Sequence, residues 1–229
     1  MTGRLSASPI AERPWRSRRW LVLAPHADDE TLGAGALIAQ AAAAGTLAAV
    51  VYLTDGSGSH PARNGRAGRL IATRQREAKL ALRRLTLGRG NAPIFLGWTD
   101  AAPETAGSPA FARTCRRLGA LCARLRVDVI ATTAPQEPHC DHAAAAELAR
   151  AVETTAGRRL AIAEYVVWGS LPVSRSHRAL ITMPMLPGAR RGALAAHRSQ
   201  LTTSNGIGFR LPKDKRAMAA HDRLYVRRR

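Results

Sequence analysis

At 229 residues the chain is close to the upper limit of what one hydrophobic core supports, so a single domain is expected. Its composition, 46% hydrophobic and 22% charged, is that of a globular protein with a full core and excludes a disordered polymer. The three cysteines are too few for a disulfide framework, which favours a reducing, cytoplasmic location.

The charge balance is strongly basic, with 35 Lys and Arg against 16 Asp and Glu and a formal net charge of +19. Such a charge favours contact with polyanions such as nucleic acid or anionic lipid. A GC-rich genome is the competing explanation, because nearly all the cations are arginines and alanine runs occur at 41–44 and 143–146. Residues 1–19 are predicted to form a flexible basic arm ahead of a single domain over 20–229. No signal peptide is expected, since no separate apolar segment with a cleavage pattern follows the first arginines.

Short apolar runs bounded by turn residues alternate with segments of helical periodicity. The predicted strands cover residues 20–24, 48–53, 92–96, 127–132 and 160–168, with a further strand around 179–183. The predicted helices cover residues 31–44, 70–87, 109–126, 142–155 and 188–200, and an exposed loop is expected over 59–69. The uncharged stretch 31–54 is long enough to span a membrane. Gly45 divides it into a helix and a strand, so no membrane span is predicted.

Alternating strands and helices predict an α/β fold, a Rossmann-like doubly wound layout with a mostly parallel sheet and helices on both faces. In the common strand order 3-2-1-4-5 the first and fourth strands are neighbours. Ligands bind at this switch point, outside the carboxyl ends of the strands. Pro25–Glu30 follows the first strand and His139–His142 follows the fourth. The topology therefore predicts that these two polar segments lie side by side.

The two segments hold the residue types of a divalent metal site. An imidazole and a carboxylate within one tight turn can both reach a cation, and His/Asp ligation suits zinc. His139 and His142 supply a further ligand and a spare proton donor. A catalytic zinc keeps three protein ligands and one open position, a count that His26, Asp29 and His142 meet. A second acidic residue beside the ligand, such as Asp28, is what hydrolysis needs to take a proton from water.

Each segment alone has a simpler explanation. Carboxylates at a helix start, such as Asp28, Asp29 and Glu30, commonly cap backbone N–H groups, and Glu30 is expected to do no more than this. Histidines three residues apart are common on protein surfaces. The metal site is favoured because both segments meet at one predicted edge of the sheet.

Two segments carry a family resemblance, namely Ala24-Pro25-His26-Ala27-Asp28-Asp29-Glu30-Thr31-Leu32-Gly33 and His139-Cys140-Asp141-His142. They resemble the two motifs of the PIG-L/LmbE-like zinc N-deacetylases, of which the second is normally His-Pro-Asp-His. Weaker similarities occur at Leu53-Thr54-Asp55-Gly56, Arg74-Gln75-Arg76-Glu77-Ala78, Phe95-Leu96-Gly97-Trp98-Thr99-Asp100 and His197-Arg198-Ser199-Gln200. Ala27 and Cys140 stand where the family usually has proline, so the backbone is expected to be less stiff there.

The resemblance implies that His26, Asp29 and His142 bind zinc, with Fe²⁺ able to occupy the same ligands. It implies that Asp28 is the general base on the zinc-bound water. The implied reaction removes an N-acyl group, usually acetyl, from an N-acetylated amino sugar or glycoconjugate, which is a small-molecule substrate.

The resemblance also implies supporting roles. Protonated His139, together with zinc, would stabilise the tetrahedral oxyanion, and Asp28 or His139 would then protonate the leaving amine. Asp141 would orient His139. Arg74 and Asp100 would contact the substrate or brace the site.

Two other functions stay open from the sequence. An amidase that cleaves a larger amide conjugate would use the same zinc site, and the width of the pocket would separate the two reactions. An arginine-rich nucleic-acid-binding protein on a degenerate hydrolase scaffold would account for the basic charge. Nucleic acid is the less favoured partner, because the chain has only ten aromatic residues, no interleaved stacking surface and no missing metal ligand.

Overall fold

The fold is described by a computed structural model, which covers residues 7–61, 66–169 and 176–227. Its strands form one sheet in the order β1-β7-β8-β6-β5-β2-β3-β4. The strands are β1 (Ala7–Pro9), β2 (Trp20–Ala24), β3 (Leu47–Thr54), β4 (Ile94–Trp98), β5 (Val129–Thr133), β6 (Ala161–Tyr165), β7 (His177–Ile181) and β8 (Arg223–Arg227). Neighbouring strands run parallel except at β8, which is antiparallel to both β6 and β7.

The part of the sheet from β4 to β6 has the order that the sequence predicted. Numbered along the chain, these five strands lie as 3-2-1-4-5, with β2 between β3 and β5. Val22 of β2 pairs with Val50 of β3 and with Ala131 of β5. The prediction of a Rossmann-like, mostly parallel sheet is confirmed, and the carboxyl ends of β2 and β5 open at the same edge.

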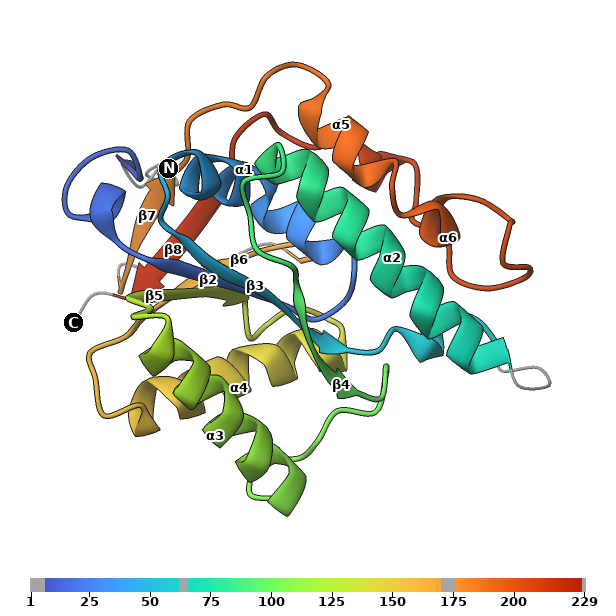
Figure 1. The fold of residues 1–229 in the computed structure, drawn as a ribbon, viewed down its shortest axis with the longest axis horizontal. Coiled ribbons are helices and arrows are strands. Elements are labelled where there is room, and N and C mark those ends of the chain that lie inside the picture. The colour runs from blue at the N-terminus through green and yellow to red at the C-terminus, as the bar shows by residue number, and fades with distance from the viewer. Residues whose placement is uncertain (1–6, 62–65, 170–175, 228–229) are drawn as a thin grey trace.

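Helices cover both faces of the sheet (Figure 1). One face carries α1 (Asp29–Ala43), α2 (Arg66–Thr86), α5 (Ala189–Leu194) and α6 (Arg198–Leu201), and the other carries α3 (Pro109–Arg124) and α4 (Cys140–Thr155). Side chains of β2 alternate between the two layers, with Val22 in one core cluster and Leu21 and Leu23 in the other. All five residues of β2 are buried because both faces are covered. Among the described residues, no helix combines the length and the apolar character that crossing a membrane requires.

Several boundaries differ from those expected. α1 begins at Asp29, so Asp29 and Glu30 lie in its first turn rather than ahead of it. The helix expected over 188–200 is two short helices, α5 and α6, separated by a break. Strand β8 was not expected. Its buried Leu224 and Val226 are separated by the partly buried Tyr225 and flanked by the exposed Arg223 and Arg227. This pattern is too short and too charged to be recognised as a strand.

The N-terminal residues differ from the flexible arm that the sequence suggested. Residues 7–9 form β1, which pairs with β7 in a parallel register. Ile10 and Trp15 are apolar residues of an otherwise polar segment, and both are buried in the core cluster that contains Leu37 and Ile38 of α1. Residues 1–6 of the expected arm and residues 62–65 of the expected loop lie outside the described part.

A glycine allows α1 to pack closely on β6. A Cβ atom on Gly33 would overlap the ring of Tyr165. That ring cannot easily yield, because it is fully buried and its hydroxyl donates to the carbonyl oxygen of Leu23 at 3.3 Å. Since Asp29 is the first residue of α1, this contact also sets how close Asp29 lies to the sheet.

Replacing Gly33 with Ala should therefore lower the free energy of unfolding by about 1–3 kcal/mol, the usual cost of overpacking a core. Gly119→Ala in α3 is the matched control, because a Cβ atom at Gly119 meets open space. That control should be neutral or stabilising by up to about 1 kcal/mol, as alanine favours helix. Urea denaturation measures both changes, and equal effects of the two variants would contradict the packing argument.

Candidate metal centre

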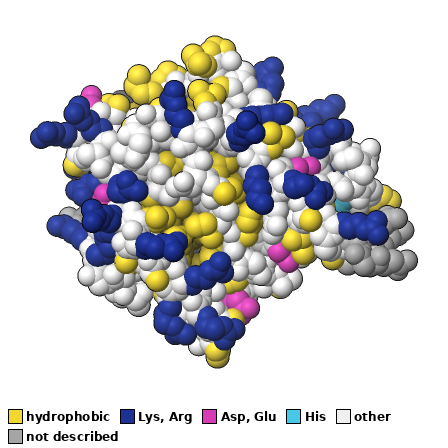
Figure 2. All heavy atoms as spheres, viewed as in Figure 1, with side chains coloured by type: hydrophobic (Ala, Val, Ile, Leu, Met, Phe, Trp, Pro, Cys, Tyr) yellow, Lys and Arg dark blue, Asp and Glu magenta, His cyan; other side chains and the backbone are white. Residues whose placement is uncertain are grey.

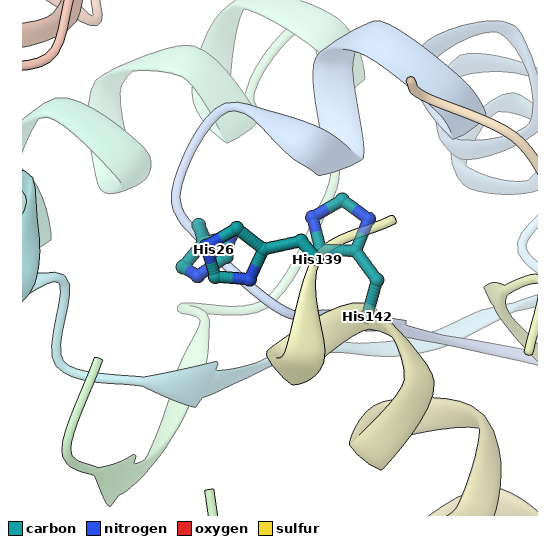
Figure 3. A group of neighbouring side chains, drawn as sticks. All are labelled: His26, His139 and His142. Carbon is teal, nitrogen blue, oxygen red and sulfur yellow. The ribbon is translucent and has the colours of Figure 1, made fainter. Parts of the chain in front are cut away.

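The carboxyl ends of β2 and β5 bring the two polar segments together, as the topology predicted. His26 and Asp28 lie between β2 and α1, and Asp29 begins α1. His139 is the N-cap of α4, and His142 lies in its first turn. Figure 3 shows the imidazoles of His26, His139 and His142 turned toward one another, and a nitrogen from each lies within 4.8 Å of the other two.

The carboxylate of Asp29 lies between two imidazoles. Its Oδ2 atom is 3.1 Å from Nδ1 of His26 and 3.2 Å from Nε2 of His142. Donor atoms around a tetrahedral zinc lie about 3.3 Å apart, given metal–ligand distances of roughly 2.0–2.1 Å. Nε2 of His142 is buried and, despite its closeness to Asp29, makes no hydrogen bond within the described part of the chain, a cost that a bound metal ion would remove. These two spacings are compatible with a divalent cation held by His26, Asp29 and His142, whereas the three imidazoles that lie within 4.8 Å of one another belong to His26, His139 and His142.

The centre carries an excess of negative charge. Burial lowers the pKa of His26, but three surrounding carboxylates outweigh burial and raise this pKa well above its usual value; they belong to Asp100, Asp141 and Asp29. Burial raises the pKa of Asp29, yet the imidazoles of His142 and His26 hold it far below its usual value. A cluster that holds protons on its imidazoles so firmly is electrostatically suited to bind a cation in their place.

Asp141 was expected to orient His139, and its contacts differ from that expectation. Its Oδ2 atom is 3.8 Å from Nδ1 of His139, which is too far for a hydrogen bond. The same oxygen is 2.9 Å from Nε2 of His26, and Oδ1 of Asp100 is 3.2 Å from that nitrogen. His26 thus presents Nδ1 to Asp29 while carboxylates hold its other nitrogen, which is how metal-binding imidazoles are commonly oriented.

Glu137 was missed at the sequence level, although it orients the second imidazole. Nδ1 of His142 donates to Oε2 of Glu137 at 3.1 Å, which leaves Nε2 free as an acceptor. The carboxylate also accepts the backbone N–H groups of Val167, Trp168 and Gly169 at 3.0–3.1 Å. Burial raises the pKa of Glu137, but these donors outweigh it and lower the pKa below its usual value. The one sequence signal was an acidic residue just before the second motif.

Asp28 has a strained backbone, with φ 130° and ψ −30°, a region that residues other than glycine rarely adopt. Its N–H donates to Oε2 of Glu30 at 2.8 Å. Its carboxyl group is buried, and Oδ1 is 4.0 Å from Nη2 of Arg74. Burial, followed by the charge of Asp29, raises the pKa of Asp28 to about 7. A carboxyl group with such a pKa can both accept and return a proton.

Glu30 does more than cap a helix. Its Oε1 atom is 3.0 Å from Nε2 of His197, and both side chains are fully buried. His197 immediately precedes α6, where the hydroxyl of Ser199 donates to Glu77 of α2 at 2.5 Å. Glu30 therefore links the backbone of Asp28 to the C-terminal part of the chain, and the family-like segment at 197–200 has a structural role.

Arg74 of α2 braces the loop before α1. Its guanidinium donates to the carbonyl oxygens of Ala27 at 2.9 Å and Gly56 at 3.2 Å. Its Nη1 atom is 3.6 Å from Oδ2 of Asp100, which follows β4. The bracing role expected of Arg74 and Asp100 is thus visible in their contacts, and both side chains also line the cavity described next.

The centre opens into a cavity of about 410 Å³, within the size range of pockets that enclose small ligands. Besides the residues of the metal centre, Trp168 and Phe209 line it. Cys140 has an exposed side chain, and its Sγ is 4.0 Å from Nδ1 of His139. Fold and cavity together define a Rossmann-like α/β protein with a buried His/Asp centre at the switch point of its sheet.

Residues 21–153, more than half of the chain, match the family model described as PIG-L, GlcNAc-PI de-N-acetylase. The chain belongs to the PIG-L family, and the resemblance read from its two motifs is confirmed. No curated protein matches the sequence.

Several solved structures share the fold. The N,N'-diacetylchitobiose deacetylase from Pyrococcus horikoshii has a TM-score of 0.61 at 21% identity, covering 81% of this chain and 71% of that one. The pseudoaglycone deacetylase Dbv21 has a TM-score of 0.64 at 19% identity, covering 92% and 97%. The teicoplanin deacetylase Orf2, solved in a zinc-inhibited form, has a TM-score of 0.61 at 19% identity, covering 91% and 97%. At these identities the likeness is one of fold.

Replacing Glu137 with Gln should weaken zinc binding about 10- to 100-fold, the usual effect of losing a carboxylate behind a metal-binding imidazole. The amide keeps the size of the side chain but cannot accept from all of its present donors. Competition with a chromophoric chelator measures the Kd for zinc. Glu164→Gln is the matched control, because Glu164 is also buried and paired, but its partners are Arg150 at 2.9 Å and His177 at 3.9 Å rather than a proposed metal ligand. An unchanged Kd in folded Glu137→Gln protein would show that Glu137 does not orient His142.

Proposed function

We propose that this protein is a metal-dependent hydrolase that removes the N-acetyl group from an N-acetylated amino sugar or glycoconjugate. One observation carries the proposal. In a member of the PIG-L family, Oδ2 of Asp29 lies 3.1 Å from Nδ1 of His26 and 3.2 Å from Nε2 of His142, and His26, Asp28 and Asp29 line a ligand-sized cavity. The likeness of fold to deacetylases named for a chitobiose and for teicoplanin supports the same reaction type.

His26, Asp29 and His142 would hold the metal ion. Two imidazoles and a carboxylate are a donor set suited to zinc, and the same set is used by non-haem Fe²⁺. A divalent cation bound there would polarise the acetamide carbonyl and acidify a water molecule. Asp141 behind His26 and Glu137 behind His142 would keep both imidazoles aimed at it.

Asp28 would move the proton. One oxygen of its carboxylate accepts a proton from the water molecule that attacks the acetyl carbonyl carbon. The C–N bond then breaks, and the same oxygen returns the proton to the leaving amine. The second proton of the water molecule stays with the acyl product, so the products are acetic acid and a free amine, which ionise to acetate and an ammonium group near neutral pH.

His139 would support the charge that develops on the carbonyl oxygen. Its Nδ1 atom accepts the backbone N–H of Asp141 at 3.2 Å, as the N-cap of α4. An imidazole that accepts at Nδ1 is neutral and carries its proton on Nε2. That N–H is available to donate to the oxyanion, so a neutral donor takes the place of the protonated imidazole suggested by the sequence.

The basic charge remains the argument for nucleic-acid binding. Figure 2 shows Lys and Arg side chains spread over one whole face rather than gathered into a stripe that would follow a phosphate backbone. The contacts of Asp29 with His26 and His142 favour a hydrolase over a degenerate scaffold. An amidase acting on a larger conjugate would use the same residues, and a substrate panel separates that reaction from N-deacetylation.

The variant Asp28→Asn should keep the metal ion and lose about 10²–10⁴-fold in the rate of acetate release, because an amide cannot accept the proton. His142→Ala should lose both the metal ion and the activity. Acetate release is measured on a panel of N-acetylated sugars and glycoconjugates, with metal content determined on the same samples. Zinc is supplied at one equivalent, since a related deacetylase is known in a zinc-inhibited form.

His177→Ala is the control for these variants. His177 lies on β7 and does not line the cavity, so its loss should change neither metal content nor rate. Full activity of metal-free wild-type protein, or of metal-loaded Asp28→Asn protein, would contradict the proposed mechanism.

A further inference from the structure

Two aromatic side chains line the cavity beside the metal centre. Trp168 follows β6, and Phe209 lies between α6 and β8, so both come from the part of the chain after the family match at 21–153. Their rings meet edge to face, with centroids 6.0 Å apart and an angle of 82° between the ring planes. Residues distant in sequence thus form one aromatic wall, defined here as Trp168 and Phe209.

The aromatic wall is accessible to solvent, whereas the other three tryptophans are not. Trp15, Trp20 and Trp98 are buried in the core. Trp168 is half-buried, and 40% of Phe209 is exposed. The fold would be more stable if these two rings were buried. Apolar surface that stays exposed beside a polar cavity is typical of a ligand site.

Hydrogen bonds from several elements hold the wall in place. The N–H of Trp168 donates to Glu137 at 3.0 Å, and its carbonyl oxygen accepts Nζ of Lys215 at 3.3 Å. The same Nζ lies 5.6 Å from the centre of the Trp168 ring. The N–H of Phe209 donates to the carbonyl oxygen of Ser59 at 2.7 Å. A wall fixed before the ligand arrives loses little freedom on binding.

Polar side chains accompany the wall. Arg74, Ser59 and the almost fully buried Gln200 line the same cavity. A ligand with an apolar face and a polar rim matches this combination. A pyranose ring has both, because C–H groups lie on its faces and hydroxyl groups at its edge. A long acyl chain would offer these polar side chains no hydrogen-bonding group.

We propose that Trp168 and Phe209 form a carbohydrate subsite, which binds the sugar ring on the amine side of the scissile N-acetyl group. The inference rests on the proposed deacetylase function. It makes the two aromatic residues determinants of substrate specificity, whereas the chemistry belongs to the metal centre.

The kinetic test uses N,N'-diacetylchitobiose and zinc-loaded protein. Trp168→Ala and Phe209→Leu should raise KM about 10- to 100-fold and leave kcat within about threefold, since stacking on the ring is the same in the ground state and the transition state. Phe209→Tyr keeps a flat ring and should behave like the wild type. The Phe209→Leu variant keeps an apolar side chain but has no flat ring. Comparing it with Phe209→Tyr therefore separates the effect of ring stacking from that of apolar contact.

Calorimetric titration of N-acetylglucosamine and N,N'-diacetylchitobiose into Asp28→Asn protein measures binding without turnover. If the wild type releases no acetate, the proposed function fails, and sugar binding that depends on Phe209 still supports the subsite. The subsite is overturned if neither sugar binds, or if Trp168→Ala and Phe209→Leu bind both as tightly as the parent. A loss confined to N-hexanoylglucosamine would assign the wall to an acyl chain and would also overturn it.

Discussion

The buried carboxylate of Asp29 is the charge on which the rest of the centre depends. A carboxylate that is 1% exposed is very unfavourable without partners, because the interior solvates it poorly. Its Oδ2 atom lies within 3.2 Å of nitrogens of His26 and His142, which come from two different segments. Those segments meet only because β2 and β5 are neighbours in the sheet. The site therefore requires this strand order as well as these side chains.

A second set of carboxylates makes this arrangement rigid. Each buried imidazole of the site is held by an acidic residue from elsewhere, and the pairs are His26 with Asp141, His142 with Glu137 and His197 with Glu30. Each carboxylate holds one ring nitrogen and thereby orients the ring, so the direction of the other nitrogen is set before any ligand arrives. Replacing one member of a pair would leave its partner buried and unpaired, which costs more free energy than replacing both members with apolar groups.

The sequence was sufficient where the signal is local. Short apolar runs and helical periodicity predicted the five strands now seen from β4 to β6 and the helices between them. The common order of doubly wound sheets then predicted that the two motifs lie side by side. Contacts between distant residues were not predictable. The carboxylate of Glu137 is held beside His142 by backbone N–H groups of the segment after β6. The sequence around Glu137 does not predict this contact. The partner of Asp141 was misassigned because His139 is nearer in sequence, whereas His26 is nearer in space. Ile10 is buried, but a single large apolar residue in a mostly polar segment does not predict burial.

The position of β8 has a consequence for the order in which the molecule assembles. β7 pairs with β1 and β8 in the described sheet, and β8 is its link to β6. Neither β7 nor the N-terminal β1 can join the sheet until residues 223–227 have been synthesised and docked, a pairing of high sequence separation. The strands and helices from β2 to α4 can pack before β8 has been synthesised, because their neighbours in the sheet precede them or follow shortly after them in the chain. The residues proposed as metal ligands all lie in that early part, so the proposed metal centre can form in a nascent chain before Phe209 of the aromatic wall has been placed.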